Sequence, residues 1–203
     1  SMSGDLPDLS PDLAALIGSR ICHDLISPIG AIGNGVELLT MSGAGEGAEL
    51  ALISESVDNA NARIRFFRIA FGMASEGQAV GRAEVLAILT DLYRGSRLKV
   101  HWGPADDCPR REVKVAFLLL QCLESAMPYG GQIRITRTDR VWQLDGEAEK
   151  LKMRDDLWAA LEGTGAVEVS AAQVHFALVP EALSRLGRRL RLERGERRIS
   201  ATF

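Results

Sequence analysis

Two long stretches in the first third of the chain carry apolar residues at every third or fourth position. In the first stretch these residues are Ile17, Ile21, Leu25, Ile29, Ile32, Val36 and Leu39. In the second they are Leu50, Ile53, Val57, Ala60, Ile64, Phe67 and Phe71. Such spacing places the side chains on one face of an α-helix. The pattern predicts one helix from about residue 10 to 41 and another from about 48 to 74.

The segments that flank these helices support the same boundaries. Ser10 is a suitable N-cap, and Pro11 fits the first helical position because its missing N–H has no partner there in any helix. Residues 1–8 are expected to be a loose lead-in, and the glycine-rich residues 42–47 form the turn between the helices. The two helices therefore form an antiparallel hairpin.

A single hairpin cannot bury the apolar residues of both helices, so part of its hydrophobic surface stays uncovered. Pairing with a second copy buries that surface in a four-helix bundle, so we expect a homodimer. The alternative is a monomer in which the rest of the chain covers the hairpin.

The rest of the chain mixes helices and strands after a linker at 75–81. Helices are expected at 82–93, 111–126, 152–161 and 180–188, and strands at 98–102, 132–139, 141–147 and 174–178, with a closing hairpin at 190–203. The elements alternate without a regular βαβ period, which favours an α+β sandwich. We expect two domains, at 9–75 and 80–203.

A second, polar face of the first helix carries the candidate chemistry. Its members are Ser19, His23, Ser27, Gly30 and Asn34. A neutral imidazole at His23 can act as a nucleophile, and Asp24 can accept the ring N–H and fix its tautomer. Pro28 has no N–H and is expected to bend the helix there. A lone histidine on a helix is more often only packed or solvated, so the neighbouring residues decide.

Composition limits the alternatives. No apolar run approaches the ~20 residues of a membrane span, and residues 1–5 lack the basic and apolar regions of a signal peptide. Cys22, Cys108 and Cys122 are odd in number and lack metal-ligand spacing, which indicates reduced thiols in the cytoplasm. Three scattered histidines give no metal site; His101 and His175 are expected to be structural residues in strands.

Basic residues are concentrated late in the chain. The net charge of −3 combines ten acidic and four basic residues up to Gly81 with seventeen acidic and twenty basic residues after it. Seven of the basic residues are arginines within 185–198, which could form a nucleic-acid patch. They alternate with aliphatic residues, and no aromatic residues are interleaved for base stacking, so a solvated face is the better interpretation.

The residues around His23 resemble the phosphoacceptor box of sensor histidine kinases. That box runs His, acid, aliphatic, variable, Thr/Asn/Ser, Pro, aliphatic, and it is matched in order by His23, Asp24, Leu25, Ser27, Pro28 and Ile29. The continuation from Gly30 to Leu39 is similar to the ChpT family of alphaproteobacterial histidine phosphotransferases. The resemblance implies a phosphorelay protein that moves a phosphoryl group between receiver-domain aspartates through a phosphohistidine.

The resemblance also implies roles for individual residues. His23 is the nucleophile, Asp24 orients it and Ser27 is a secondary catalytic residue. The residues expected to contact a receiver are Cys22, Ile26, Ser27, Gly30 and Asn34. The implied partners are the receiver domains of a hybrid histidine kinase and of response regulators, together with a second copy of the chain. Mg²⁺ is expected in the receiver, so this chain needs no cofactor or metal of its own.

The second half is similar in element order to the ATP-binding domain of histidine kinases, but its motifs are degenerate. Gln121 and Ser125 stand where kinases carry two Mg²⁺-binding asparagines, and Asp145-Gly146 lacks the second glycine of the kinase glycine box. The chain is therefore not expected to be an ATP-dependent kinase. Two alternatives stay open: a sensor-kinase core that binds ATP through an unusual domain, and a non-catalytic dimeric scaffold.

Overall fold

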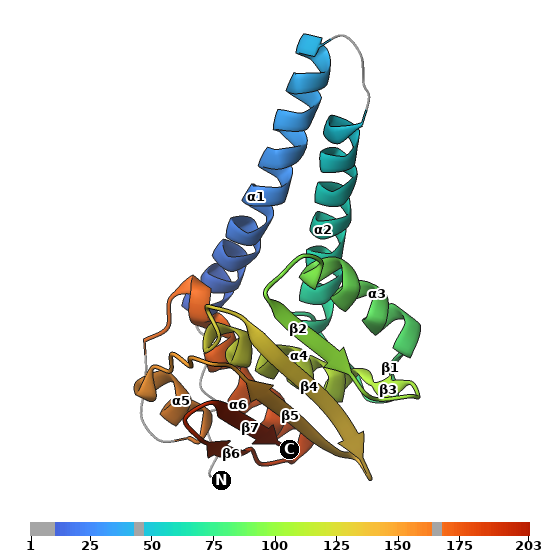
Figure 1. Ribbon diagram of the computed structural model, residues 1–203. Coiled ribbons are helices and arrows are strands. Elements are labelled where there is room, and N and C mark those ends of the chain that lie inside the picture. Colours follow the sequence, from blue (N-terminus) through green and yellow to red (C-terminus); the bar gives the residue numbers. More distant parts are fainter. Residues whose placement is uncertain (1–10, 43–46, 164–167) are drawn as a thin grey trace.

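Two long helices form a hairpin that projects from a layered arrangement of helices and strands (Figure 1). The computed structural model describes residues 11–42, 47–163 and 168–203. Helix α1 spans Pro11–Ser42 and α2 spans Ala48–Ala70. The predicted helical hairpin is confirmed; the expected N-cap at Ser10 and most of the turn at 42–47 lie outside the described residues. No helix in the described ranges combines the length and apolarity that crossing a membrane requires.

The rest of the chain forms an α/β sandwich. Its elements in order are β1 (Ala79–Val80), α3 (Arg82–Tyr93), β2 (Leu98–Trp102), β3 (Cys108–Pro109), α4 (Arg110–Ser125), β4 (Gly131–Thr138), β5 (Val141–Glu147), α5 (Asp155–Leu161), a 3₁₀ turn η1 (Ala171–Gln173), α6 (Val174–Leu186), β6 (Arg191–Arg194) and β7 (Arg198–Thr202). The main sheet has the order β2-β4-β5-β7-β6, and β1 pairs with β3 separately. Within the main sheet only β2 and β4 run parallel. The α+β fold expected from the sequence is confirmed.

The strands β4 and β5 are joined by a tight two-residue turn. Asp139 and Arg140 have φ angles of 51° and 67°, and the flanking residues Thr138 and Val141 are paired. Two successive left-handed residues match the right-handed twist of a hairpin, and aspartate tolerates this conformation better than most residues. The turn therefore fixes the register of the two central strands.

One sequence prediction was wrong. Residues 174–178, expected to be a strand, are the first turns of helix α6, which continues through Pro180 to Leu186. A short apolar run is compatible with either a buried strand or a buried helix, and here Val174, His175 and Phe176 are all buried. Gly187 ends the helix in the left-handed conformation, with φ 67°.

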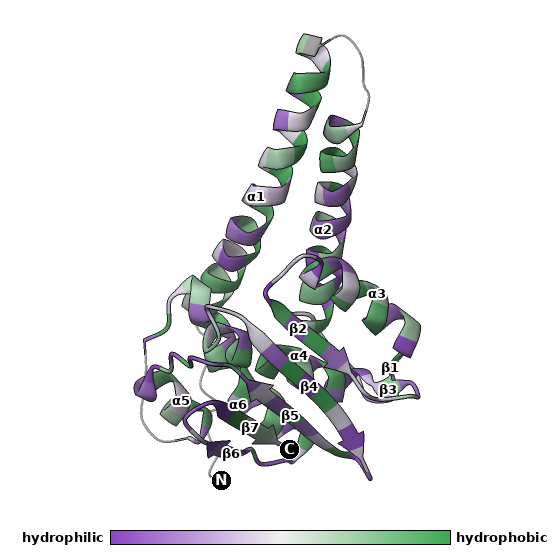
Figure 2. Cartoon of the chain, viewed as in Figure 1, coloured by the Kyte–Doolittle hydropathy of each residue, from purple (hydrophilic) through white to green (hydrophobic). Residues whose placement is uncertain are grey.

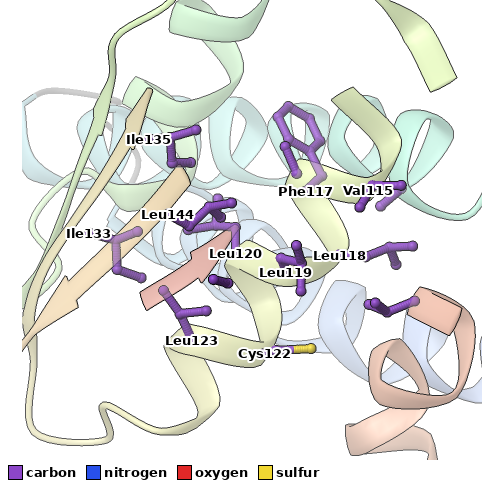
Figure 3. Close-up of a cluster of buried hydrophobic side chains, with 14 of the residues drawn as sticks. Val115, Phe117, Leu118, Leu119, Leu120, Cys122, Leu123, Ile133, Ile135 and Leu144 are labelled. Carbon is purple, nitrogen blue, oxygen red and sulfur yellow. The ribbon is translucent and has the colours of Figure 1, made fainter. Parts of the chain in front are cut away.

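Helix α4 is the centre of the core (Figure 3). It contacts β4 and β5 of the sheet and also helices α2 and α6, so strands and helices together cover it. As a result, every residue from Val115 to Leu120 is fully buried. The core continues into the hairpin, because Phe66 of α2 stacks on Phe117 with 4.5 Å between the ring centroids.

The two helices of the hairpin approach closely where one of them carries a glycine. A Cβ added at Gly35 of α1 would lie 2.6 Å from Cγ1 of Ile53 in α2. Only glycine allows this approach without a shift of the isoleucine side chain. The two helices are thus held together by their own packing at Gly35 and Ile53, and by the core shared with the sandwich at Phe66.

Apolar side chains remain exposed along the hairpin. Figure 2 shows hydrophobic positions continuing along both helices beyond the layered part of the molecule. Of the apolar series in α2, Ala60 and Phe67 are buried, whereas Leu50, Val57 and Ile64 are 39–49% exposed. Ile29 and Val36 of α1 are likewise 58% and 50% exposed. We call these five exposed residues the apolar stripe.

Candidate functional site

His23 stands on α1 with its ring in solvent. The side chain is 85% exposed, and Nδ1 lies 3.3 Å from Oδ1 of Asp24. In the tautomer that carries the proton on Nδ1, the ring donates to this carboxylate and leaves the lone pair of Nε2 facing outward. An exposed nitrogen of this kind is open to a reacting group on another molecule.

The carboxylate of Asp24 is held from both helices of the hairpin. Its Oδ2 accepts a hydrogen bond from Nε of Arg20 at 2.9 Å and lies 3.6 Å from a guanidinium nitrogen of Arg63. The Asp24 side chain is only 14% exposed. One carboxylate oxygen is therefore committed to the arginines, and the other faces His23.

Asp24 lies at a polar crevice of about 210 Å³ between the hairpin and the sandwich. Besides Asp24 and the two arginines, its polar lining includes Tyr93, Gln121 and Glu124. The hydroxyl of Tyr93 donates to Oε2 of Glu124 at 2.9 Å. Burial raises the pKa of this hydroxyl well above its usual value, and the nearby Glu124 carboxylate adds to the effect. Tyr93 is therefore a permanent donor at neutral pH.

Arg20 also links the site to the sandwich. One terminal guanidinium nitrogen donates to the carbonyl of Ala172 at 2.8 Å and lies 3.2 Å from Nδ1 of His175. His175 is 2% exposed, and burial lowers its pKa to about 3, with the Arg20 charge as a second cause. Its ring is therefore neutral at physiological pH and can accept the Arg20 hydrogen bond. Its Nε2 is buried and has no partner within the described structure.

All of the residues predicted to contact a receiver are exposed on the surface. They are Cys22, Ile26, Ser27, Gly30 and Asn34. A Cβ added at Gly30 would meet no atom within 4 Å, so packing inside this chain does not require glycine there. Ser27 lies one turn beyond His23, at the edge of a second polar crevice. The roles assigned to these residues, and to Ser27 in catalysis, stay predictions.

Sequence reasoning missed part of the site. It did not single out Arg20, Arg63, Tyr93 or His175 as neighbours of Asp24. Arg20 was detectable, because a basic residue four positions before an acid forms an ion pair along a helix. The other three come from α2, α3 and α6, so only the fold brings them to the crevice. His175 is buried, as expected, but in a helix; His101 is exposed on β2.

The positions that bind Mg-ATP in kinases have other contacts in this protein. Ser125 donates its hydroxyl to the carbonyl of Cys122 in its own helix at 2.6 Å. Gln121 is buried and lines the crevice beside the hairpin. A Cβ at Gly146 would lie 3.0 Å from the methyl group of Met127, so little space is left there. Within the described ranges no three His, Cys, Asp or Glu residues are grouped as metal ligands.

The second half of the chain matches one known protein family. A family model described as the histidine phosphotransferase C-terminal domain matches residues 82–198, which is more than half of the chain. The chain therefore belongs to this family, and the resemblance found from the sequence is confirmed.

Two relatives extend the comparison. The protein phosphotransferase ChpT of Brucella abortus (strain 2308) is 43% identical over 126 residues, which are 61% of this chain and 60% of that protein. The match thus spans about 60% of the length of this curated relative. A solved structure of a bacterial phosphotransferase aligns with a TM-score of 0.76 and 31% identity, covering 94% of this chain and 95% of that one.

The low pKa of His175 predicts that the stability of the fold decreases in acid. Its pKa is about 3 in the folded chain against 6.5 as a reference, so the unfolded state binds more protons between these values. The contribution is present above pH 6.5 and is lost as the pH falls toward 3. His175→Asn keeps an acceptor near Nδ1 but does not titrate. We expect the free energy of unfolding of this variant to fall less steeply with acidification, by up to about 1.4 kcal/mol per pH unit.

Urea unfolding at several pH values between 7 and 4 measures the two slopes. The comparison between the proteins removes the contribution of the carboxylates they share. Equal slopes in the wild type and the variant would contradict the assignment of a neutral, buried His175.

Proposed function

We propose that this chain is a histidine phosphotransferase that moves a phosphoryl group between receiver domains in a multi-step phosphorelay. The observation that carries the proposal is the 85% exposed ring of His23 with Nδ1 beside the fixed carboxylate of Asp24. The chain's membership of the histidine phosphotransferase family supports it. The proposed domains remain 9–75, which carries the site, and 80–203, and the proposed location remains the cytoplasm.

In the proposed reaction, the lone pair of His23 Nε2 attacks the phosphorus of an aspartyl phosphate in line. The new P–N bond forms as the P–O bond to the receiver aspartate breaks, and the carboxylate leaves with its electron pair. The ring becomes positively charged, and Asp24 stabilises that charge through the Nδ1–H. A second receiver reverses the sequence by attacking with its own aspartate.

The surface around His23 is suited to docking a folded partner. Ser27, Gly30 and Asn34 continue the His23 face with small exposed side chains, and Ile26 adds an apolar side chain that is 68% exposed. An apolar contact with a polar surround is typical of transient interfaces. The proposed partners are a receiver of a hybrid histidine kinase as donor and receivers of response regulators as acceptors, each supplying its own Mg²⁺.

We also propose that the chain works as a homodimer through the apolar stripe. The sandwich covers the lower end of α2, where Phe66 and Phe67 are buried, but it leaves the stripe exposed. Leu50, Val57 and Ile64 recur every seven residues, the spacing of a bundle seam. A second hairpin that packs against the stripe would bury it in a four-helix bundle.

The first prediction from the proposed function concerns His23. His23→Ala should abolish labelling by a phosphorylated receiver, because no other nucleophile occupies that position on the helix. Asp24→Asn should slow transfer by roughly a hundredfold, the lower end of the effect of an acid–base group, since the nucleophile remains. Transfer is measured with a labelled receiver, and the product should be acid-labile and base-stable, as a phosphoramidate is.

Asn34→Arg separates docking from chemistry. It places a long charged side chain three turns from His23 on the same face, so it should weaken transfer from a receiver and leave labelling by the small donor phosphoramidate unchanged. If His23→Ala still accepts phosphate from a receiver at the wild-type rate, the proposed function is wrong.

The second prediction concerns the dimer. Ile64→Asp should weaken association, because a charge in a dry seam is costly when it is buried without a partner. Ala51→Asp adds the same charge at an exposed position of α2 that is not three or four residues from Leu50, Val57 or Ile64, so it should leave association intact. Light scattering at micromolar concentration measures the mass. A monomer mass for the wild type would rule out the proposed dimer.

The third prediction concerns ATP. We expect no Mg-ATP binding with a dissociation constant below about 1 mM, which corresponds to roughly −4 kcal/mol. The reason is that Gln121 and Ser125 supply no metal-binding asparagines and that side chains surround Gly146. Saturable binding by calorimetry, or autophosphorylation with ATP, would instead favour an unusual sensor kinase.

A further inference from the structure

One side chain bridges the reactive face of the hairpin and the sandwich. Arg20 on α1 bonds Asp24 through Nε at 2.9 Å, and it bonds Ala172 of η1 and His175 of α6 through one terminal nitrogen at 2.8 and 3.2 Å. The Arg20 side chain is only 17% exposed. A planar guanidinium that is hydrogen-bonded on two edges has little freedom to rotate.

The bonds to the sandwich determine where Arg20 can hold Asp24. Arg63, the other cation at this carboxylate, lies farther away at 3.6 Å, and its own Nε is occupied by Asn59 of α2 at 2.9 Å. Neither of these Arg63 contacts involves η1 or α6. Arg20 is therefore the closer of the two cations and the one that ties Asp24 to the sandwich.

The orientation of Asp24 matters because His23 has little else to orient it. The ring is 85% exposed and lies 3.3 Å from Oδ1 of Asp24. The hydrogen bond at one ring nitrogen decides which nitrogen keeps its lone pair. With Oδ2 held by Arg20, Oδ1 stays beside Nδ1, and Nε2 remains available for reaction.

His175 and Ala172 suit the task of anchoring a cation. The carbonyl of Ala172 is a permanent acceptor, and the neutral ring of His175 offers a lone pair at Nδ1. A protonated ring would instead repel Arg20. The charged and titratable groups that face Arg20 are Asp24 on its own helix, Arg63 across the crevice and Glu124 on α4. Burial raises the pKa of Glu124, and His175 contributes no charge.

We infer that Arg20 is a positioning residue through which the sandwich fixes Asp24 and so holds His23 in the tautomer with a free Nε2. This inference rests on the proposed function only for the use of that nitrogen in phosphoryl transfer. It assigns the sandwich a part in the chemistry without nucleotide binding.

The test combines a structural and a kinetic measurement on the full chain. Nitrogen NMR of the imidazole reports the tautomer of His23, which should be mainly Nδ1–H in the wild type and should shift toward Nε2–H in Arg20→Gln. Labelling by phosphoramidate, which needs no receiver, should slow about tenfold, less than the roughly hundredfold loss of an acid–base group itself. Arg20→Lys keeps the positive charge but loses the planar guanidinium. Its His23 tautomer population and its labelling rate should therefore lie between those of the wild type and of Arg20→Gln.

Two controls show whether Arg20 acts through Asp24. Arg68→Gln removes an exposed positive charge from α2 and should change neither measurement. In an Asp24→Asn background, Arg20→Gln should cause no further slowing, because coupled residues are not additive. Independent, additive effects would overturn the inference.

Further outcomes decide the remaining cases. A folded Arg20→Gln protein with wild-type tautomer and labelling rate would overturn the inference. If that variant does not fold, a wild-type His23 that is mainly Nε2–H would overturn it equally. If receivers fail to label His23 while the tautomer depends on Arg20, the proposed function fails and the positioning role stands.

Discussion

The packing of α2 against α4 is the contact on which the rest of the structure depends. Phe66 stacks on Phe117 in a core to which α2 also contributes Phe67, Ile69 and Ala70. Burial of one such ring stabilises a fold by roughly 1.5–3 kcal/mol, and stacking adds to this. Because the lower end of the hairpin is part of that core, α1 is held at a fixed place beside η1 and α6. The crevice and the Arg20 contacts are consequences of this arrangement.

The same arrangement separates the faces of α1. Ile21 and Leu25 are partly buried, and Asp24 points toward the arginines of the crevice, whereas His23 is left almost entirely in solvent. Consecutive residues on a helix differ by about 100° in direction. His23 can therefore face solvent and Asp24 the crevice while their side chains are still in contact. This combination suits the proposed transfer to a macromolecular partner, because the ring can be reached while its orienting carboxylate stays held by the arginines.

The parts of the fold that follow from local pattern were predictable from the sequence. Periodicity predicts the hairpin and most of the helices. The strand expected at 174–178 was wrong because a short, mostly apolar run fits a buried helix equally well, and a proline such as Pro180 is typical of the first turn of a new helix. In the site, His23 and Asp24 were predictable because their neighbours resemble a known motif. Arg63 and His175 were not, since long-range packing alone brings them to Asp24.

Helix α4 of the sandwich packs against the hairpin as well as against the sheet. Helix α4 is buried on all sides between Val115 and Leu120, and Ser125 bonds to its own backbone. Gln121 faces the hairpin crevice, and Lys114 donates to the carbonyls of Ala70 and Gly72 at the end of α2. Burial lowers the pKa of Lys114 to about 8, so this contact is made by a group that stays mostly charged at neutral pH. Polar side chains of α4 thus support the hairpin and tie the sandwich to it.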